Sequence, residues 1–392
     1  MINIFQYKNF LIIFYFSYLL AQTPYQFHLL DSDQLNRYEH NSIKGQLANN
    51  AVIDIKKSGE SLYFFGTGNG LSYGEIIDND SIDFGFFNIS TMPRGGNPAL
   101  AVNGNSIAVS GVIDTSVITG TEPKGTGIAY STNTGEDWKY LPQPIDHAGT
   151  LWHCPSTQNP QDEWYLDMSS CSGVCYDKYN NPDECRQLFQ WIKWGDQDSI
   201  LSLLVTTEVD NVSYDLAIYN EYIYAASWAG GLRRYPIGII GGNEKKQWEI
   251  IPLPRDDDLD LYCNAIDTSY YLNPRDPADG GHHNHKGFSV YVNDGIIWAG
   301  TAAGINKGEL GGNCINWIGH YSSWQNNISG NWVIGFTSQK LDNNTERLWA
   351  ITWNADTQGE FSALSYTDDG GDTWNTTQPA GYPEKVYNLY AN

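Results

Sequence analysis

The sequence predicts an all-β fold, a β-propeller of four-stranded blades. Three observations favour this prediction: one short apolar strand recurs six times, each copy has a partner strand before it, and glycine and aromatic residues are frequent. The chain has 392 residues, of which 39 are glycine and 14% are aromatic. Such a composition favours strands joined by tight turns over helices.

The recurring strand is the second strand of each predicted blade, and it ends in a small residue. Its six copies read SLYFFGT (61–67), NSIAVSG (105–111), EWYLDMS (163–169), EYIYAAS (221–227), GIIWAGT (295–301) and ERLWAIT (346–352). The strands before them read AVIDIKKS (51–58), PALAVNG (98–104), GTLWHCPS (149–156), YDLAIYN (214–220), FSVYVND (288–294) and WVIGFTSQ (332–339). Sheets stacked around an axis cover each other's faces, which explains such a repeat. A β-sandwich would require the six copies to be coincidental.

Two further signals complete the predicted blade. A third strand opens with glycine and an apolar residue in several copies, and a fourth often opens with tryptophan, at Trp138, Trp248, Trp317 and Trp374. We therefore expect a leader over residues 22–50 and six blades of a single domain over 51–385. Residues 386–392 resemble another first strand, so we expect an incomplete further blade in a truncated chain. Unusual closure of the ring is the alternative.

The first 21 residues are predicted to be a signal peptide. Residues 10–20 (FLIIFYFSYLL) form an apolar run too short to span a bilayer comfortably, and Ala21 offers a small residue for cleavage. A buried N-terminal strand is the alternative. We expect a secreted, periplasmic or cell-surface protein with no membrane span after cleavage.

The cysteine content agrees with export. The six cysteines are Cys154, Cys171, Cys175, Cys185, Cys263 and Cys314. A metal knuckle is disfavoured because the spacing does not match a zinc site. We therefore expect disulfides, with the first four cysteines paired among themselves and Cys263 joined to Cys314. The sequence does not choose among all the pairings.

The charge balance excludes one class of partner. Lys and Arg number 22 and Asp and Glu number 45, which gives a formal net charge of −23. Nucleic-acid binding requires a basic face that neutralises phosphates, so we expect no nucleic-acid partner.

Two segments share a polar turn pattern that ends in tryptophan. Residues 367–374 read TDDGGDTW and residues 131–138 read STNTGEDW. The first matches the Asp-box, or bacterial neuraminidase repeat, S/T-x-D-x-G-x-T-W, and the second is a weaker copy. The chain therefore resembles the Asp-box propellers, which include sialidases, xyloglucanases, the sortilin ectodomain and photosystem-assembly propellers. The resemblance covers most of residues 51–392 as architecture, but only two blades as motif.

The box residues are interpreted as structural rather than catalytic. A short carboxylate or amide can bind turn amides, glycine supplies an unusual backbone angle, and tryptophan packs between blades. The residues concerned are Ser131, Asn133, Gly135, Trp138, Thr367, Asp369, Gly371, Thr373 and Trp374. The Phe/Tyr-Arg-Ile-Pro motif of sialidases is absent, so the resemblance does not assign catalytic residues.

Long connecting segments are expected on one face of the ring. They are residues 111–125, 170–185, 254–287, 320–331 and 353–361, which join second to third strands or one blade to the next. Long loops on a rigid scaffold often carry function. Candidate ligand-binding residues on this face are Trp228, Trp324, Trp353, Tyr270, Tyr271, Arg233 and Arg255. The alternative for each aromatic residue is that it packs its own loop.

Two clusters in these segments could hold a metal ion. Asp256 and Asp258 could bind Ca²⁺, although no EF-hand spacing is present and a solvated acidic loop is the favoured interpretation. His282, His283 and His285 could bind a transition metal, or be ordinary polar loop residues. We expect that no cofactor is required.

The sequence leaves two functions open. The favoured one is a secreted, non-catalytic propeller that binds an extracellular glycan or protein through the loop-rich face. The alternative is a glycoside hydrolase of sialidase- or xyloglucanase-like type with divergent catalytic residues. Such an enzyme needs two carboxylates at a defined separation, and 45 acids do not identify a pair.

Overall fold

The computed structural model contains strands and very little helix. It describes residues 43–78, 81–118, 120–146, 151–153, 174–176, 182–184, 186–195, 198–204, 206, 208–238, 246–256, 258–263, 271–272, 281–312, 314–342, 345–355, 358–378 and 385–390. The helices in this part of the chain are α2 (Gly281–Asn284) and α3 (Ser323–Asn326), each of one turn. No helix among these residues is long and apolar enough to cross a membrane.

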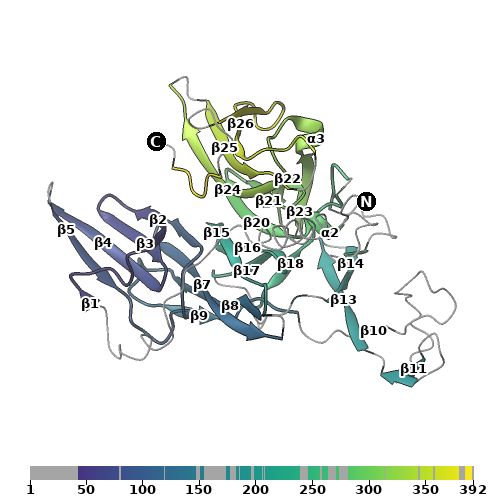
Figure 1. Ribbon diagram of the computed structural model, residues 1–392, viewed down its shortest axis with the longest axis horizontal. Helices are drawn as coiled ribbons and strands as arrows, with labels where there is room; N and C mark the ends of the chain where they lie inside the picture. Colours follow the sequence, from purple (N-terminus) through teal and green to yellow (C-terminus); the bar gives the residue numbers. More distant parts are fainter. Residues whose placement is uncertain are drawn as a thin grey trace, which may run out of the picture.

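Five sheets each contain four antiparallel strands that are consecutive in sequence, with one extra edge strand on the first sheet, and they form a β-propeller (Figure 1). Blade 1 contains β2 (Val52–Ser58), β3 (Leu62–Thr67), β4 (Gly70–Asp78) and β5 (Ser81–Phe86), and blade 2 contains β6 (Leu100–Asn103), β7 (Ser106–Val117), β8 (Gly120–Ser131) and β9 (Lys139–Leu141). Blade 3 contains β15 (Ser213–Tyr219), β16 (Tyr222–Ser227), β17 (Gly231–Pro236) and β18 (Glu249–Ile251). Blade 4 contains β20 (Gly287–Asn293), β21 (Ile296–Thr301), β22 (Gly304–Gly311) and β23 (Cys314–Tyr321), and blade 5 contains β24 (Trp332–Lys340), β25 (Glu346–Trp353), β26 (Ala363–Thr367) and β27 (Asn375–Thr377).

The prediction of six blades is wrong, because the segment between blades 2 and 3 does not form one. Its strands β10 (Leu151–His153), β13 (Arg186–Trp194) and β14 (Asp198–Leu203) join β19 (Tyr271–Leu272) in a separate sheet, in which β14 and β19 are parallel. A further hairpin consists of β11 (Val174–Tyr176) and β12 (Pro182–Glu184). The predicted strand 163–169 lies outside the described residues.

The physical reason is that blade 2 packs directly on blade 3. Strand β15 contacts β6 and β7, so the inner strands of these two blades are neighbours, with no sheet between them. Figure 1 shows β10, β11 and β13 beside the ring rather than within it. The alternation of apolar residues in this segment does indicate strands, but it does not specify which sheet they join.

Buried apolar side chains hold neighbouring blades together. Between blades 1 and 2 these include Phe64, Leu71, Leu100 and Ile107, all at most 1% exposed. Similar clusters join blade 2 to blade 3, blade 3 to blade 4, and blade 4 to blade 5. Burial of one such side chain contributes about 1.5–3 kcal/mol, so the interfaces between blades are the main source of stability.

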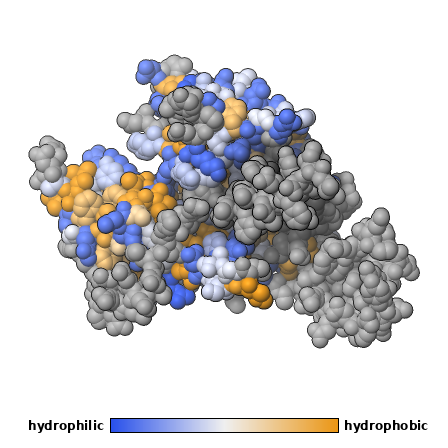
Figure 2. All heavy atoms as spheres, in the orientation of Figure 1, coloured by the Kyte–Doolittle hydropathy of each residue, from blue (hydrophilic) through white to orange (hydrophobic). Residues whose placement is uncertain are grey.

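Blade 1 also carries exposed apolar residues. Figure 2 shows hydrophobic atoms gathered over this blade, at the left of the view. Among its exposed large side chains are Ile55, Ile76 and Ile82. Ile55 pairs with Phe65, and Ile76 pairs with Ile82, so they share the sheet face opposite to Phe64.

The two ends of the domain differ from the sequence prediction. Part of the predicted leader joins the propeller, since β1 (Ile43–Lys44) pairs with β5 at the edge of blade 1. The expected strand at 386–392 is not formed over the described residues 385–390. Instead, Asn388 Nδ2 donates to Ile53 O on the inner strand of blade 1 at 3.2 Å. The predicted signal peptide, residues 1–21, lies outside the described residues.

The predicted disulfide between Cys263 and Cys314 is confirmed, with the Cα atoms 6.2 Å apart. It ties the segment between blades 3 and 4 to β23. In a chain-entropy model, a crosslink over 51 residues stabilises the fold by about 4 kcal/mol. The side chains of Cys154, Cys171, Cys175 and Cys185 lie outside the described structure.

The antiparallel order of the blades places all turns between second and third strands, and all segments between blades, at one end of the ring. We call this the loop-rich end. Neighbouring segments bind each other there: Ala302 N donates to Lys286 O at 3.0 Å, and Phe361 N donates to Ser329 O at 2.9 Å. One expected insertion is not a loop, because residues 111–125 are mostly paired within the long hairpin of β7 and β8.

Candidate functional site

An aromatic cluster lies at the loop-rich end, beside the inner strands. Trp228, in the turn between β16 and β17, packs against Phe288 of β20 and Trp332 of β24, with ring centroids 5.2 and 6.0 Å away. Lys286 Nζ lies 4.6 Å from the Trp228 ring centroid. Burial lowers the pKa of Lys286. Trp228 is half-buried, so the cluster presents part of an indole and a cation together.

Trp353 has a structural position. Its side chain is 2% exposed, and its Nε1 donates to Val386 O at 2.8 Å. The ring of Tyr387 packs on it edge-on, at 5.0 Å. Trp353 therefore anchors the C-terminal segment and has almost no surface for a ligand.

Trp324 is the opposite case, with 81% of its surface exposed. It lies on α3, and hydrogen bonds of the neighbouring residue Ser323 hold this short helix in place. Ser323 N donates to Asn331 Oδ1 at 2.8 Å, and Ser323 Oγ donates to Glu360 Oε1 at 2.9 Å. A large aromatic side chain thus projects into solvent from an anchored loop.

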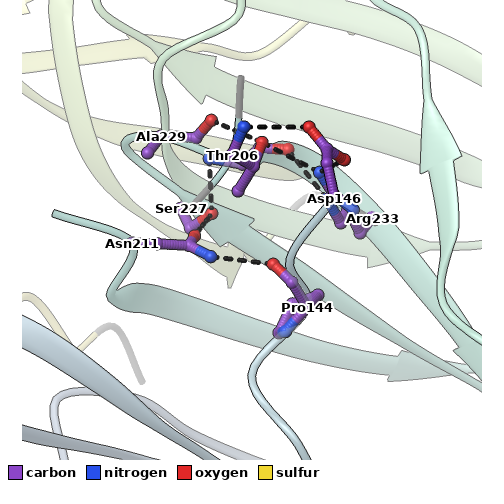
Figure 3. Close-up of polar contacts among 8 residues, drawn as sticks. Pro144, Asp146, Thr206, Asn211, Ser227, Ala229 and Arg233 are labelled. Carbon is purple, nitrogen blue, oxygen red and sulfur yellow. Dashed lines mark hydrogen bonds and ion pairs between the residues drawn. The ribbon is translucent and has the colours of Figure 1, made fainter. Parts of the chain in front are cut away.

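Arg233 is buried in a polar network (Figure 3). Its Nη2 lies 2.7 Å from Asp146 Oδ1 and 3.0 Å from Thr206 Oγ1, and its Nε donates to Gly230 O at 3.2 Å. Thr206 N in turn donates to Asp146 Oδ2 at 2.9 Å. The side chains of Arg233 and Asp146 are 5% and 6% exposed. The guanidinium therefore fastens the segments on either side of the separate sheet to blade 3.

The acidic cluster and the histidine segment meet, as neighbours rather than as a ligand shell. Asp256 Oδ1 accepts a hydrogen bond from Asn284 N at 2.7 Å, and Asp256 Oδ2 lies 3.7 Å from His283 Nδ1. Arg255 Nε lies 3.3 Å from Asp258 Oδ2. Asp256 thereby holds the segment that contains α2.

The histidines of this segment have different surroundings. His283 is exposed, whereas His285 is 5% exposed, and burial lowers the pKa of His285 to about 3. The side chain of His282 lies outside the described structure. Within the described residues, no group of three or more His, Cys, Asp and Glu side chains could hold a metal ion.

Two predicted ligand-binding residues have no described side chain. Tyr270 lies outside the described residues. Tyr271 begins β19, where its backbone pairs with Leu201. The structure therefore brings together Trp228, Arg233, Asp256 and His285 at the loop-rich end, and it places Trp324 on the same end.

The 367–374 turn is held by the carboxylate of Asp369. Asp369 Oδ1 accepts from Thr367 Oγ1 at 2.7 Å and from Thr373 N at 2.9 Å, and Oδ2 accepts from Thr373 Oγ1 at 2.6 Å. Gly371, with φ of 103°, donates its N–H to Thr367 Oγ1. The bonds from Thr373 lead the effects that lower the pKa of Asp369 to about 2.

The 131–138 turn has the same arrangement of hydrogen bonds, except that one side-chain bond has its donor and acceptor exchanged. Asn133 Oδ1 accepts from Ser131 Oγ at 2.8 Å and from Asp137 N at 3.0 Å. Here Asn133 Nδ2 donates to Asp137 Oδ2 at 3.0 Å, whereas in the 367–374 turn Thr373 Oγ1 donates to Asp369 Oδ2. The carboxylate is therefore at the seventh position of this turn rather than at the third. Trp138 Nε1 also donates to Gly135 O at 2.9 Å. Both turns join a third to a fourth strand, away from the loop-rich end.

Sequence reasoning missed a charged group on the inner strands. Lys56 Nζ lies 3.4 Å from Asp54 Oδ1 on β2 and interacts electrostatically with Asp215 on β15. Asp215 accepts hydrogen bonds from Leu216 N and Val290 N, each at 2.9 Å. Burial raises the pKa of Asp215 to about 7, against the opposing effects of Lys56 and these N–H groups. The sequence signal that could have revealed this group is an aspartate at a similar position in two apolar inner strands, Asp54 in β2 and Asp215 in β15.

A large cavity lies on the outer rim, where blades 2 and 3 meet β13, and has a volume of about 1200 Å³. Sequence reasoning missed it because its walls are strands rather than long loops. Its lining includes Trp191 of β13, Tyr140 of β9 and Trp248 beside β18. We call it the rim groove.

No family model and no curated protein matches the sequence. Among solved structures, YCF48 bound to D1 peptide is similar, with 13% identity, a TM-score of 0.31, and coverage of 86% of this chain and 85% of that one. A Trypanosoma rangeli sialidase mutant displaying trans-sialidase activity has 9% identity and a TM-score of 0.35, with coverage of 85% and 49%. A thermostable family-43 glycoside hydrolase has 12% identity and a TM-score of 0.29, with coverage of 86% and 95%. The arrangement of its own sheets, rather than these weak likenesses, makes this chain a β-propeller.

Proposed function

We propose that this protein is an exported Asp-box β-propeller that binds an extracellular glycan or protein, without catalysis, through its loop-rich end. The observation that carries the proposal is Trp324, which is 81% exposed on an anchored loop. An exposed indole costs hydrophobic free energy unless a partner covers it. Trp228, with Lys286 over its ring, adds a second aromatic surface at the same end.

The assignment to the Asp-box group rests on the two polar turns. Both carry the same set of side-chain bonds to backbone N–H groups, at the same place between third and fourth strands. A local side-chain bond of this kind stabilises a tight turn and requires no ligand. The turns therefore support membership and contribute no binding residues.

Export is supported by the apolar run at residues 10–20 and by the disulfide between Cys263 and Cys314. Disulfides persist in oxidising compartments. The proposal is tested by expressing the full chain in a secreting host and sequencing the N-terminus of the mature protein. We expect it to begin at Gln22. An uncleaved N-terminus on protein retained inside the cell would contradict export.

Binding is tested with a glycan microarray, an affinity capture of extracellular proteins and a panel of fluorogenic glycosides. We expect a ligand whose affinity falls roughly ten-fold or more in Trp324→Ala, because truncating an aromatic anchor often costs more than 1 kcal/mol. Ile77→Ala is the control, because Ile77 is an exposed apolar residue near the end of β4, away from the loop-rich end. Turnover of any glycoside would reject a purely binding function.

Hydrolysis remains a second candidate because two carboxylates, Asp54 and Asp215, lie near Lys56 on the inner strands. A pKa of about 7 for Asp215 suits a general acid. If the chain is a glycoside hydrolase, Asp215→Asn abolishes turnover and Asp54→Asn reduces it. Glycoside turnover that both variants retain would remove this pair from consideration.

The binding function proposed here requires no cofactor. Ca²⁺ at Asp256 and Asp258, and a transition metal at His282, His283 and His285, are tested by calorimetric titration of the purified chain with Ca²⁺ and Zn²⁺. Heat that disappears in Asp256→Asn would establish a metal site, and the absence of heat with both ions would dispose of it.

A further inference from the structure

The rim groove is a built concavity. Its walls are the outermost strands of two blades, β9 and β18, and strand β13 of the separate sheet. Its volume of about 1200 Å³ exceeds that of sites for single small molecules, which measure roughly 300–1000 Å³. The groove therefore has room for several linked units of a chain-like ligand.

Aromatic side chains line the groove and remain accessible. Trp191 is 55% exposed and Tyr140 is 46% exposed. Tyr140 donates its hydroxyl proton to Thr126 O at 2.7 Å, and Trp248 Nε1 donates to Pro142 O at 3.2 Å. These bonds fix the polar atoms of the rings, so the aromatic surfaces can be offered to a ligand at little cost in side-chain entropy.

The side chain of Gln143 has an oxygen atom that accepts no hydrogen bond from the described residues. Its side chain is 7% exposed and lines the groove, and its Nε2 donates to Asn211 O at 2.6 Å and to Ser213 Oγ at 3.2 Å. These two bonds fix the orientation of the amide. Its Oε1, however, has no hydrogen-bond partner in the described part of the chain. Oε1 is itself covered, so the groove wall has to shift slightly before a hydroxyl or N–H group of a ligand satisfies it.

The charge of the groove is opposite to that of the protein. Its lining contains the cations Arg94, Lys124, Arg233, Arg234 and Lys246 and the acids Asp146, Glu208 and Glu249. Three pairs form among them: Arg233 with Asp146, Arg234 with Glu249, and Lys124 with Glu208. Arg94 and Lys246 remain as surplus cations in a chain of net charge −23. Arg94 is exposed and has no ion pair within the described residues. A basic groove in an acidic protein favours an anionic ligand.

We propose that the rim groove binds an acidic oligosaccharide. Sugar rings pack on Trp191 and Tyr140, a hydroxyl group donates to Gln143 Oε1, and a carboxylate or sulfate pairs with Arg94. An acidic peptide is the less favoured ligand. The edge strands offered to it, β9 and β18, have three residues each, which gives a peptide few backbone bonds. This site adjoins the loop-rich end, since Arg94 and Gln143 belong to segments between blades. It does not depend on the function proposed for Trp324 and Trp228.

The test is calorimetric titration of the full chain with three probes. They are a tetramer of galacturonic acid, the neutral tetramer of galactose and a tetramer of glutamic acid. We expect the galacturonate tetramer to bind most tightly, and its affinity to fall as salt is raised. Preference for the neutral sugar or for the peptide, or no binding of the galacturonate tetramer, would overturn the proposal.

Variants locate the site. Arg94→Gln and Trp191→Ala should each weaken galacturonate binding roughly ten-fold or more, because a charge-assisted bond and an aromatic contact are lost. Both side chains are exposed, so the folded state should persist, as thermal melting would verify. Trp324→Ala should leave this affinity unchanged. An effect of Trp324→Ala alone would assign the binding to the loop-rich end and refute the groove.

Discussion

The loop-rich end and the rim groove use the same residue types in different ways. At the loop-rich end, charged side chains bind other parts of the chain: Arg233 pairs with Asp146 where this end adjoins the groove, and Asp256 accepts from the backbone of Asn284. In the groove, Arg94 is exposed and Gln143 Oε1 has no partner among the described residues. A polar residue on a long loop is therefore weak evidence of binding, because it often serves to hold the loop.

One of the largest expected effects on stability is at Arg233. Arg233→Ala should lower the free energy of unfolding by roughly 3–5 kcal/mol, because it leaves Asp146 buried without its cation. Arg94→Ala, in the groove, should change it by less than about 0.5 kcal/mol. Chemical denaturation of both variants measures the difference. Equal effects would remove the distinction between the two regions.

Buried histidine at the loop-rich end should make stability depend on pH. His320 is 5% exposed, its Nδ1 lies 2.9 Å from Asn306 Oδ1, and burial lowers its pKa to about 4. The unfolded chain takes up this proton near pH 6.5, so stability should fall as pH drops from about 6.5 to about 4, by on the order of 3 kcal/mol. His320→Gln should flatten the profile in that range.

His285 contributes with the same sign, since its pKa is lowered to about 3. Its effect should therefore continue below pH 4, where that of His320 has levelled off. Unfolding measured between pH 3 and 7 in each single variant separates the two histidines. A wild-type profile that rises as the pH falls would contradict the burial of both.

The polar turns provide a reference at the opposite end of the ring. Asp369→Ala removes an acceptor of three hydrogen bonds and should cost about 1–2 kcal/mol of stability. Asn133→Ala should cost a similar amount, because it also removes two accepted bonds and one donated bond. Neither should alter ligand affinity at the loop-rich end or in the groove. A binding defect in folded Asp369→Ala would show that the turns are more than structural.

The smallest expected effect on stability is at Trp324. Since this side chain is 81% exposed, Trp324→Ala should change the free energy of unfolding by less than about 0.5 kcal/mol. Trp353→Ala is the buried counterpart and should be destabilising by about 3–5 kcal/mol. Thermal and chemical unfolding of the two variants tests whether Trp353 contributes to the stability of the fold while Trp324 does not.

The sequence predicted most of the fold from short-range patterns. The second strands end at or next to Thr67, Ser227, Thr301 and Thr352, and the hydroxyls of these residues do bind within or beside the following turn. The two polar turns were also recognisable, because the side-chain bonds made by Ser131, Asn133, Thr367 and Asp369 join residues at most four apart. The extra blade was predicted in error, since β13 and β14 have the strand pattern but join a separate sheet.

The candidate sites depended far more on tertiary structure. Arg233 and Asp146 are 87 residues apart in sequence, and Gln143 binds Asn211 across 68 residues. Alternation and turn chemistry determined by themselves that the chain makes blades, where their strands lie and how their turns are held. Only the packing of blade 2 on blade 3 decided which strands form the separate sheet outside the ring. The same packing decided which charged side chains are paired and where the groove lies. Local patterns encode contacts within a few residues, whereas burial and charge pairing depend on segments that meet only when the ring forms.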